Sequence, residues 1–331
     1  MLQFFRNNQI TTIPLIVLYF IVLFGANIVH PMSMPSIMPQ WNILMDYVWG
    51  IVGLDTFTIN TTWILLILGQ VFGLNALINY FKLSRRFTYI TTIAVMLTYG
   101  FIPASVAAFP ILIANIFLTF ALFNLFNTYV NKGLNGGIFN ATAWLGLATL
   151  FYTPYLMLLL VFYMGLYTLR GLHLKENVVF ILGILVPYIL MGTSQFLMDN
   201  FSNWLGLEVL GSWSLFKFDS NILSIEIILS GIAFVLVLLW LLSIGMNLQQ
   251  KTTLQEKSYI QILYWSLLMA IAMIFLKGDF AIYQLNVLAI PVALLMSLGL
   301  QAISVNKRAE IWHWLLLGFA LLIQYAYFLL S

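Results

Sequence analysis

Two carboxylates in one loop are the first residues in this chain that could carry out chemistry. Asp46 and Asp55 lie between the first apolar run and the second, in a stretch that also holds tryptophan, methionine and proline. A carboxylate can remove a proton from an attacking hydroxyl group or bind a divalent metal ion. Asp46 and Asp55 are therefore candidate catalytic residues. The alternative for Asp46 is a charge that is simply solvated.

Three more residues are candidates for binding a substrate. Lys277 and Asp279 flank a glycine between two later apolar runs, and Glu226 lies near the start of another run. Lys277 could bind the phosphate of a lipid-linked substrate, or it could pair locally with Asp279. Carboxylates inside a membrane are costly and often functional. Glu226, however, lies close enough to the end of its run to reach the interface.

The residue counts exclude several kinds of site. The chain has no cysteine, which excludes disulfides, cysteine nucleophiles and thiolate metal sites. Its three histidines, His30, His173 and His313, are far apart, and no phosphate-binding or dinucleotide-binding glycine motif occurs. The sequence therefore predicts no structural zinc site and no built-in nucleotide site, and it leaves the identity of any cofactor open. A net charge of only +3 favours no nucleic-acid partner.

The composition indicates which class of secondary structure holds these candidate residues in place. Of 331 residues, 63% are hydrophobic and only 7% are charged, whereas soluble domains carry about 25% charged residues. A soluble protein of this size could not bury so much apolar surface. The sequence therefore predicts an all-α, polytopic membrane protein, with residues 1–331 forming a single membrane domain.

The spacing of charges predicts about eleven transmembrane helices. A bilayer core about 30 Å thick needs about 20 helical residues. The uncharged stretches 87–131 and 133–169 are each long enough for two helices, with breaks expected near Gly100–Pro103 and at Thr153–Pro154. Single helices are expected in the first apolar run and at 62–81, 177–198, 227–250, 258–276, 280–306 and 311–331.

The basic residues predict the orientation. With Arg6 in the cytoplasm, eleven of the 13 lysines and arginines fall in cytoplasmic segments, and only Lys217 and Lys277 do not. Cytoplasmic loops of membrane proteins are enriched in these residues. The pattern predicts a cytoplasmic N-terminus and an extracytoplasmic C-terminus. Most acidic residues then lie on the extracytoplasmic side. Either they remain there because the basic residues occupy the cytoplasmic side, or an outward-facing cavity uses one or two of them as a base or metal ligand.

Residues 38–54 are expected to lie flat at the outer interface. At helical spacing one face carries Trp41, Leu44, Met45, Val48 and Val52, whereas Asp46 and Gly50 point away from it. The second outer loop, about residues 199–221, is similarly aromatic and is expected at the same interface. Amides within the apolar runs, such as Gln70, Asn115 and Asn286, should form hydrogen bonds between helices. The Gly69–Gly73 pair indicates close helix packing.

Two stretches carry a resemblance to known families. Residues 139–154 (FNATAWLGLATLFYTP) and 283–291 (YQLNVLAIP) stand within a layout of short apolar helices and basic turns. The whole chain resembles a family of multi-pass bacterial inner-membrane proteins of unknown function that is typical of Bacteroidota. More distantly, residues 1–190 resemble the membrane part of the GT-C glycosyltransferases. Those enzymes place acidic residues in a long first outer loop. They often have closely spaced acids just after the first span, and residues 30–35 contain none.

The GT-C resemblance implies a fold, a location and a reaction. The expected fold is GT-C-like, in the bacterial inner membrane, and the expected reaction is sugar transfer from a polyprenyl-phosphate carrier on the extracytoplasmic side. Asp46 or Asp55 would then act as base or metal ligand, and Lys277 would neutralise the lipid phosphate. Two alternatives remain: a non-catalytic scaffold or assembly subunit that binds other membrane proteins, and a transporter. Membrane lipids are expected partners in every case.

Overall fold

The computed structural model describes residues 5–6, 12–32, 42–84, 87–130, 136–171, 173–211, 214–217, 225–250, 253–279, 281–303 and 306–330. Nearly all of these residues are helical. The long elements are α2 (Thr12–Val29), α4 (Thr56–Tyr80), α5 (Ile90–Gly100), α6 (Phe109–Val130), α7 (Gly136–Phe151), α8 (Leu158–Arg170), α9 (Leu174–Leu197), α11 (Ile225–Gln250), α12 (Leu254–Phe275), α13 (Ala289–Ala302) and α14 (Asn306–Leu330). Each segment predicted to cross the membrane contains one of these helices.

Six helical stretches in the described part of the chain are long and apolar enough to cross a membrane. They are Thr12–Val29, Thr56–Tyr80, Val106–Val130, Leu174–Leu197, Leu254–Phe275 and Ile282–Ala302. Several other apolar helices, including α5 and α7, are shorter. Together with the composition, these helices make the chain an all-α integral membrane protein.

The two predicted breaks are confirmed, and proline accounts for both. Helix α5 ends at Gly100, and Pro103 follows before the 3₁₀ turn η1 (Val106–Ala108) leads into α6. Helix α7 ends at Phe151, and Pro154 lies in the 3₁₀ turn η2 (Thr153–Met157) before α8. Proline lacks the amide hydrogen needed to continue a helix, so the chain turns at these points.

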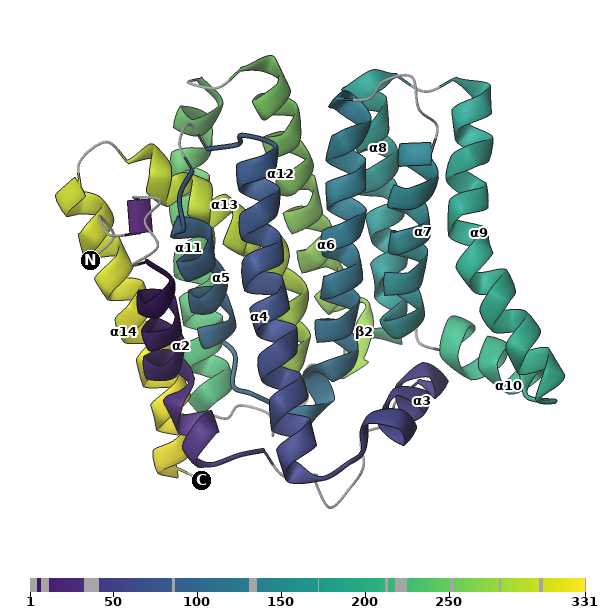
Figure 1. Ribbon diagram of the computed structural model, residues 1–331, viewed down its shortest axis with the longest axis horizontal. Helices are drawn as coiled ribbons and strands as arrows, with labels where there is room; N and C mark the ends of the chain where they lie inside the picture. The colour runs from purple at the N-terminus through teal and green to yellow at the C-terminus, as the bar shows by residue number, and fades with distance from the viewer. Residues whose placement is uncertain are drawn as a thin grey trace.

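The helices run side by side as a bundle whose connections lie at two ends (Figure 1). At one end, called here the α3 end, lie α3 (Ile43–Val52), η2, α10 (Phe201–Asn203) and the π-helical turn η3 (Trp204–Leu210). The opposite end holds the connections α4–α5, α8–α9 and α13–α14. The bundle thus separates the loops with the candidate acids from the loops that carry most basic residues.

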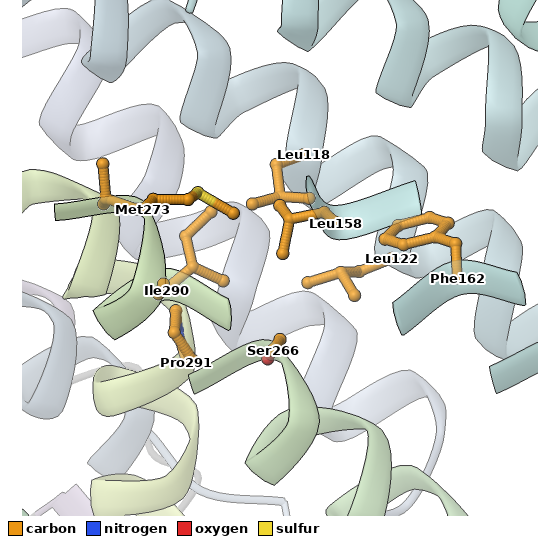
Figure 2. Close-up of a pocket in the computed structure, with 10 residues that line it drawn as sticks. Leu118, Leu122, Leu158, Phe162, Ser266, Met273, Ile290 and Pro291 are labelled. Carbon is orange, nitrogen blue, oxygen red and sulfur yellow. The ribbon is translucent and has the colours of Figure 1, made fainter. Parts of the chain in front are cut away.

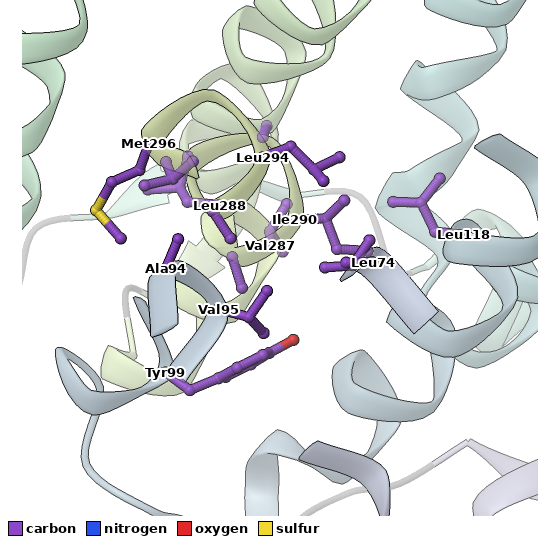
Figure 3. Close-up of a cluster of buried hydrophobic side chains, with 14 of the residues drawn as sticks. Leu74, Ala94, Val95, Tyr99, Leu118, Val287, Leu288, Ile290, Leu294 and Met296 are labelled. Atoms are coloured by element: carbon purple, nitrogen blue, oxygen red, sulfur yellow. The ribbon is translucent and has the colours of Figure 1, made fainter. Parts of the chain in front are cut away.

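Helix α13 and the 3₁₀ turn η5 (Ile282–Leu288) form the centre of the bundle. The stretch Ile282–Ala302 is 89% buried within the protein, whereas Leu174–Leu197, at the edge, is only 22% buried. Figure 3 shows side chains from η5 and α13 packed against Leu74 of α4, Val95 of α5 and Leu118 of α6. The outermost helix therefore exposes its apolar side chains to lipid, as a membrane protein requires.

Glycines allow two helix pairs to approach closely. A Cβ atom added to Gly69 or Gly73 of α4 would lie 3.3 Å from Ile116 or 3.5 Å from Thr119 of α6, which confirms the expected close packing. A Cβ atom added to Gly183 of α9 would lie 2.8 Å from the Phe139 carbonyl oxygen of α7. Because that neighbour is backbone, a larger residue there would push the two helices apart.

A network of buried amides and phenols joins five segments in the interior. Asn115 of α6 donates to the Tyr99 hydroxyl (3.1 Å) and to the Asn286 carbonyl of η5 (3.0 Å), and it accepts a bond from the Tyr155 hydroxyl of η2 (2.5 Å). Tyr99 of α5 also donates to Gln70 of α4, whose amide donates to a backbone carbonyl of α6. The expectation that buried amides bond between helices is confirmed for Gln70 and Asn115.

Candidate functional site

Helix α3 is attached to the end of α7 through Asn42. The Asn42 carboxamide accepts a hydrogen bond from the Met45 amide (3.2 Å), which caps the helix start. The same side chain donates to the Leu150 and Phe151 carbonyls, at 2.7 and 2.9 Å. Those carbonyls belong to the last turn of α7 and have no partner within their own helix. Asn42 thus provides hydrogen-bond partners for an amide at the start of α3 and for two carbonyls at the end of α7, and it fixes where α3 begins.

Helix α3 has ten residues and lies at the α3 end, beside the long helices of the bundle (Figure 1). It extends about 15 Å, half of what a bilayer core requires. Asp46 and Gly50 are exposed, as the sequence predicts, and Met45 is buried. The side of α3 that packs against the rest of the protein is formed by Met45 and Trp49, and Trp49, which the predicted face does not include, packs at 4.9 Å against Phe109. Val52 of the predicted face is exposed, and Trp41 lies outside the described residues.

A second carboxylate, Glu208 of η3, holds the start of α3. Its Oε1 atom accepts a 2.6 Å hydrogen bond from the Ile43 amide, and its backbone carbonyl accepts a 3.2 Å bond from the Thr153 hydroxyl of η2. Glu208 therefore links η3 both to α3 and to the turn that follows α7. The Ile43 amide belongs to the first turn of α3, where a negative charge also interacts favourably with the helix dipole.

Glu208 and Asp46 influence each other electrostatically. Partial burial raises the pKa of Glu208 above its ordinary value of 4.5, and the nearby negative charge of Asp46 raises it further, while the hydrogen bond from Ile43 opposes both effects. Two neighbouring carboxylates in different environments can divide proton donation and acceptance between them. In this pair Asp46 is the exposed member and Glu208 the half-buried one.

Asp55 has a structural role in α4. Its Oδ2 atom accepts a 3.0 Å bond from the Thr58 amide, and its Oδ1 atom accepts a 2.5 Å bond from the Thr58 hydroxyl. These hydrogen bonds lower the pKa of Asp55, which is the behaviour of a helix N-cap. The catalytic role predicted for Asp55 remains a prediction, and its carboxylate already caps a helix.

Two short strands connect Lys277 to the loop that contains Glu208. Strand β1 (Ser214–Lys217) begins six residues after Glu208 and pairs in parallel with β2 (Lys277–Asp279). Ser214 lies opposite Lys277 in this pairing, and Lys217 lies opposite Asp279. The side chains of Lys277 and Asp279 lie outside the described residues, as does that of Glu226, whose backbone forms the second position of α11. The strands nevertheless bring the backbone of Lys277 to the α3 end.

No family model, curated protein or solved structure matches this chain.

The sequence analysis did not select Glu208 as a site residue. It is the only acidic residue in the aromatic stretch 201–216, and this was the available signal. Its contact with Ile43 joins positions 165 residues apart, which no local pattern reveals. Within the described residues, no group of three or more His, Asp or Glu side chains gathers to hold a metal ion.

The bundle interior also contains a small apolar cavity. Figure 2 shows Leu118, Leu122, Leu158 and Phe162 facing Met273 across it. Its volume is about 10 Å³, near the minimum for one water molecule. A sugar or a lipid headgroup does not fit in this cavity.

The raised pKa of Glu208 predicts a pH-dependent stability. A carboxyl group whose pKa is higher in the folded state stabilises that state below its ordinary pKa of 4.5 and loses the contribution as pH rises through the folded value. The thermal stability of the wild type relative to Glu208→Gln should therefore fall as the pH rises from 4.5. Melting curves of both proteins in the same detergent, recorded over a range of pH, would measure this difference in stability. Glu256→Gln, at the opposite end of the bundle, is the control. A difference that stays constant with pH would contradict the burial of Glu208.

Proposed function

We propose that this membrane protein transfers a sugar from a polyprenyl-phosphate carrier to a hydroxyl group at the extracytoplasmic side. The observation that supports this most directly is the carboxylate pair of Asp46 and Glu208. The pair is held by the hydrogen bond between Glu208 and Ile43, at the end of the bundle that also holds the Lys277 backbone. A base for the acceptor hydroxyl and a cation for the leaving phosphate are the groups that this reaction uses.

In the proposed reaction, Asp46 removes the proton from the acceptor hydroxyl. The acceptor oxygen then attacks the anomeric carbon of the sugar, and the bond from that carbon to the carrier phosphate breaks. The bonding electrons leave with the phosphate, whose negative charge is stabilised by Lys277. Glu208 is a positioning residue, because it holds the first turn of α3 and with it the Asp46 carboxylate.

The proposed location is the bacterial inner membrane, crossed eleven times. Helices at all the predicted positions and the division of charges between the two ends support this topology. The connections that carry Lys82, Arg170 and Lys175 lie at one end, whereas Asp46 and Glu208 lie at the other. The α3 end would then face outward, together with the C-terminus, and the N-terminus would be cytoplasmic.

The topology makes a prediction for the C-terminus. An alkaline phosphatase fused after Ser331 should be active, because that enzyme acquires its disulfides only outside the cytoplasm. The same fusion placed after Lys257, at the opposite end, should be inactive. Activity of the second fusion together with inactivity of the first would reverse the proposed orientation and move Asp46 to the cytoplasm.

The reaction can be tested with reconstituted protein. The full chain is placed in vesicles that contain a polyprenyl-phosphate-linked hexose, and release of polyprenyl phosphate is measured. Lys277→Met should raise the donor KM about fivefold, because one basic residue near a lipid phosphate contributes about 1 kcal/mol, and kcat should change little. Lys257→Met at the opposite end is the matched control. If the correctly inserted wild type releases no carrier phosphate, the transferase proposal fails and the non-catalytic scaffold becomes the leading alternative.

A further inference from the structure

The opposite end of the bundle contains a pocket that the proposed transfer reaction does not use. It has a volume of about 500 Å³ and is formed by the end of α4, the connection that leads to α5 and one residue of α6. Its lining residues are Asn75, Ala76, Asn79, Tyr80, Lys82, Phe87, Thr88, Tyr89 and Phe123. This volume lies within the range of about 300–1,000 Å³ that is typical of small-molecule sites.

Two residues that line the pocket each carry a buried side-chain oxygen that has no hydrogen-bond partner among the described residues. These oxygens are Oδ1 of Asn75 and Oγ1 of Thr88, whose side chains are only 7% and 6% exposed. Buried polar atoms in folded proteins nearly always have a partner, and an orphan needs an explanation. A ligand that presents hydroxyl groups would supply a donor to Asn75 and either a donor or an acceptor to Thr88.

The walls of the pocket are fixed by the fold. Asn79 bonds the Thr88 backbone twice: its amide donates to the Thr88 carbonyl (3.2 Å), and its oxygen accepts from the Thr88 amide (3.3 Å). Tyr80 of α4 packs at 4.9 Å against Phe123 of α6. The loop between α4 and α5 is thereby held against the two helices. The pocket is formed before any ligand binds, which lowers the cost of binding.

Among the described residues, the mouth of the pocket combines one cation with exposed aromatic rings. Lys82 is exposed, and no acidic side chain lines the pocket. Tyr80 and Phe87 are 59% and 58% exposed, and Phe72 and Phe120 continue this apolar surface along α4 and α6. Helix α4 ends at Tyr80, so Lys82 lies just beyond the end of the helix, while the aromatic surface continues along the helix.

We propose that this pocket binds the headgroup of an anionic glycerophospholipid of the cytoplasmic leaflet. The phosphate lies beside Lys82, the headgroup hydroxyls reach Asn75 and Thr88, and the acyl chains leave along the exposed surface of Phe72 and Phe120. The shared chemistry is a phosphate ester with neighbouring hydroxyls, as in phosphatidylglycerol or in free glycerol phosphate. The amphipathic mouth favours the lipid.

Native mass spectrometry of the delipidated full-length protein in detergent can test this. Phosphatidylglycerol, phosphatidylcholine and soluble glycerol phosphate are titrated separately, and bound adducts are counted. Phosphatidylglycerol should bind at least about fivefold more tightly than phosphatidylcholine, as expected where one basic residue meets an anionic lipid. Lys82→Gln should remove most of that preference. Lys257→Gln, which removes an exposed lysine outside the pocket at the same end, should leave the preference unchanged.

A second pair of variants tests the buried hydroxyl. Thr88→Val should weaken phosphatidylglycerol binding about threefold, as expected for one lost hydrogen bond. Thr91→Val is the matched control, because Thr91 is also buried with an unpartnered Oγ1 but does not line the pocket. Equal binding of the two lipids, or equal effects of the test and control variants, would overturn the proposal. Tight binding of glycerol phosphate without binding of the lipid would replace the lipid by a soluble phosphate ester.

Discussion

Asp46→Asn should reduce the rate of sugar transfer by about 10²- to 10⁴-fold, which is the usual contribution of a general base. Asparagine keeps the size of the side chain and cannot accept the proton of the acceptor hydroxyl. Because Asp46 is exposed on a surface helix, the variant should fold and insert like the wild type. The measurement is kcat for release of polyprenyl phosphate in reconstituted vesicles, with expression and melting temperature recorded beside it.

Two controls isolate the role of Asp46. Asp199→Asn removes another exposed acid at the α3 end. Asp199 has a φ of 55°, a conformation that asparagine also adopts readily, so this change should be nearly silent. Asp55→Asn should also be mild, because asparagine is an equally good N-cap. If Asp46→Asn retains wild-type kcat while Asp55→Asn does not, the catalytic assignment passes to Asp55.

Glu208 should respond differently from Asp46. Glu208→Gln keeps an oxygen that can accept from the Ile43 amide, so α3 should stay in place and kcat should fall only a few-fold. Glu208→Ala removes that bond and should lower kcat much further. A residue that transfers the proton itself would lose kcat to a similar extent in both variants, because neither glutamine nor alanine can take part in that transfer. This comparison separates positioning of α3 from a direct proton transfer by Glu208.

Asn115→Leu should destabilise the protein by about 2 to 5 kcal/mol. The substitution leaves the Tyr155 hydroxyl and the Asn286 carbonyl without their partner. Unsatisfied buried groups cost about 1–3 kcal/mol each, although hydrogen bonds between membrane helices are often weaker. The expected effect is large because one side chain joins α6, α5, η2 and η5.

Reversible unfolding of the purified protein in mixed micelles would measure this loss. Asn124→Leu is the matched control, because Asn124 lies on the same helix and bonds only the Phe120 carbonyl of its own helix. That control should change stability by less than about 0.5 kcal/mol. Equal stability of the two variants would mean that the buried network is not important for holding the helices together.

The helices and their breaks were predictable because they depend on local patterns. Uncharged length predicts a helix that can enter a membrane, and Pro103 and Pro154 mark where two long stretches divide. The exposure of Asp46 and Gly50 was also predictable, from helical periodicity. Trp49 was missed because the choice of buried face depends on its contact with Phe109, 60 positions away along the chain.

The partners in the candidate site could not be predicted from local patterns. The pairing of Ser214–Lys217 with Lys277–Asp279 is short and non-local, and neither segment alternates apolar and polar residues as longer strands do. The bond between Glu208 and Ile43 depends on how η3 folds back over the end of α7. The sequence indicated that Gln70 and Asn115 would bond between helices, but the phenols that they contact emerge only from the packed structure.

The make-up of the buried network has a consequence for how the protein responds to an energised membrane. Gln70, Tyr99, Asn115, Tyr155 and Asn286 contribute amides, phenols and peptide groups, none of which carries a formal charge. A transmembrane voltage does about 2.3 kcal/mol of work per elementary charge for each 100 mV, whereas it acts on neutral groups only through their dipoles. A rearrangement of this network would therefore carry little gating charge, and its equilibrium would differ little between polarised and depolarised cells.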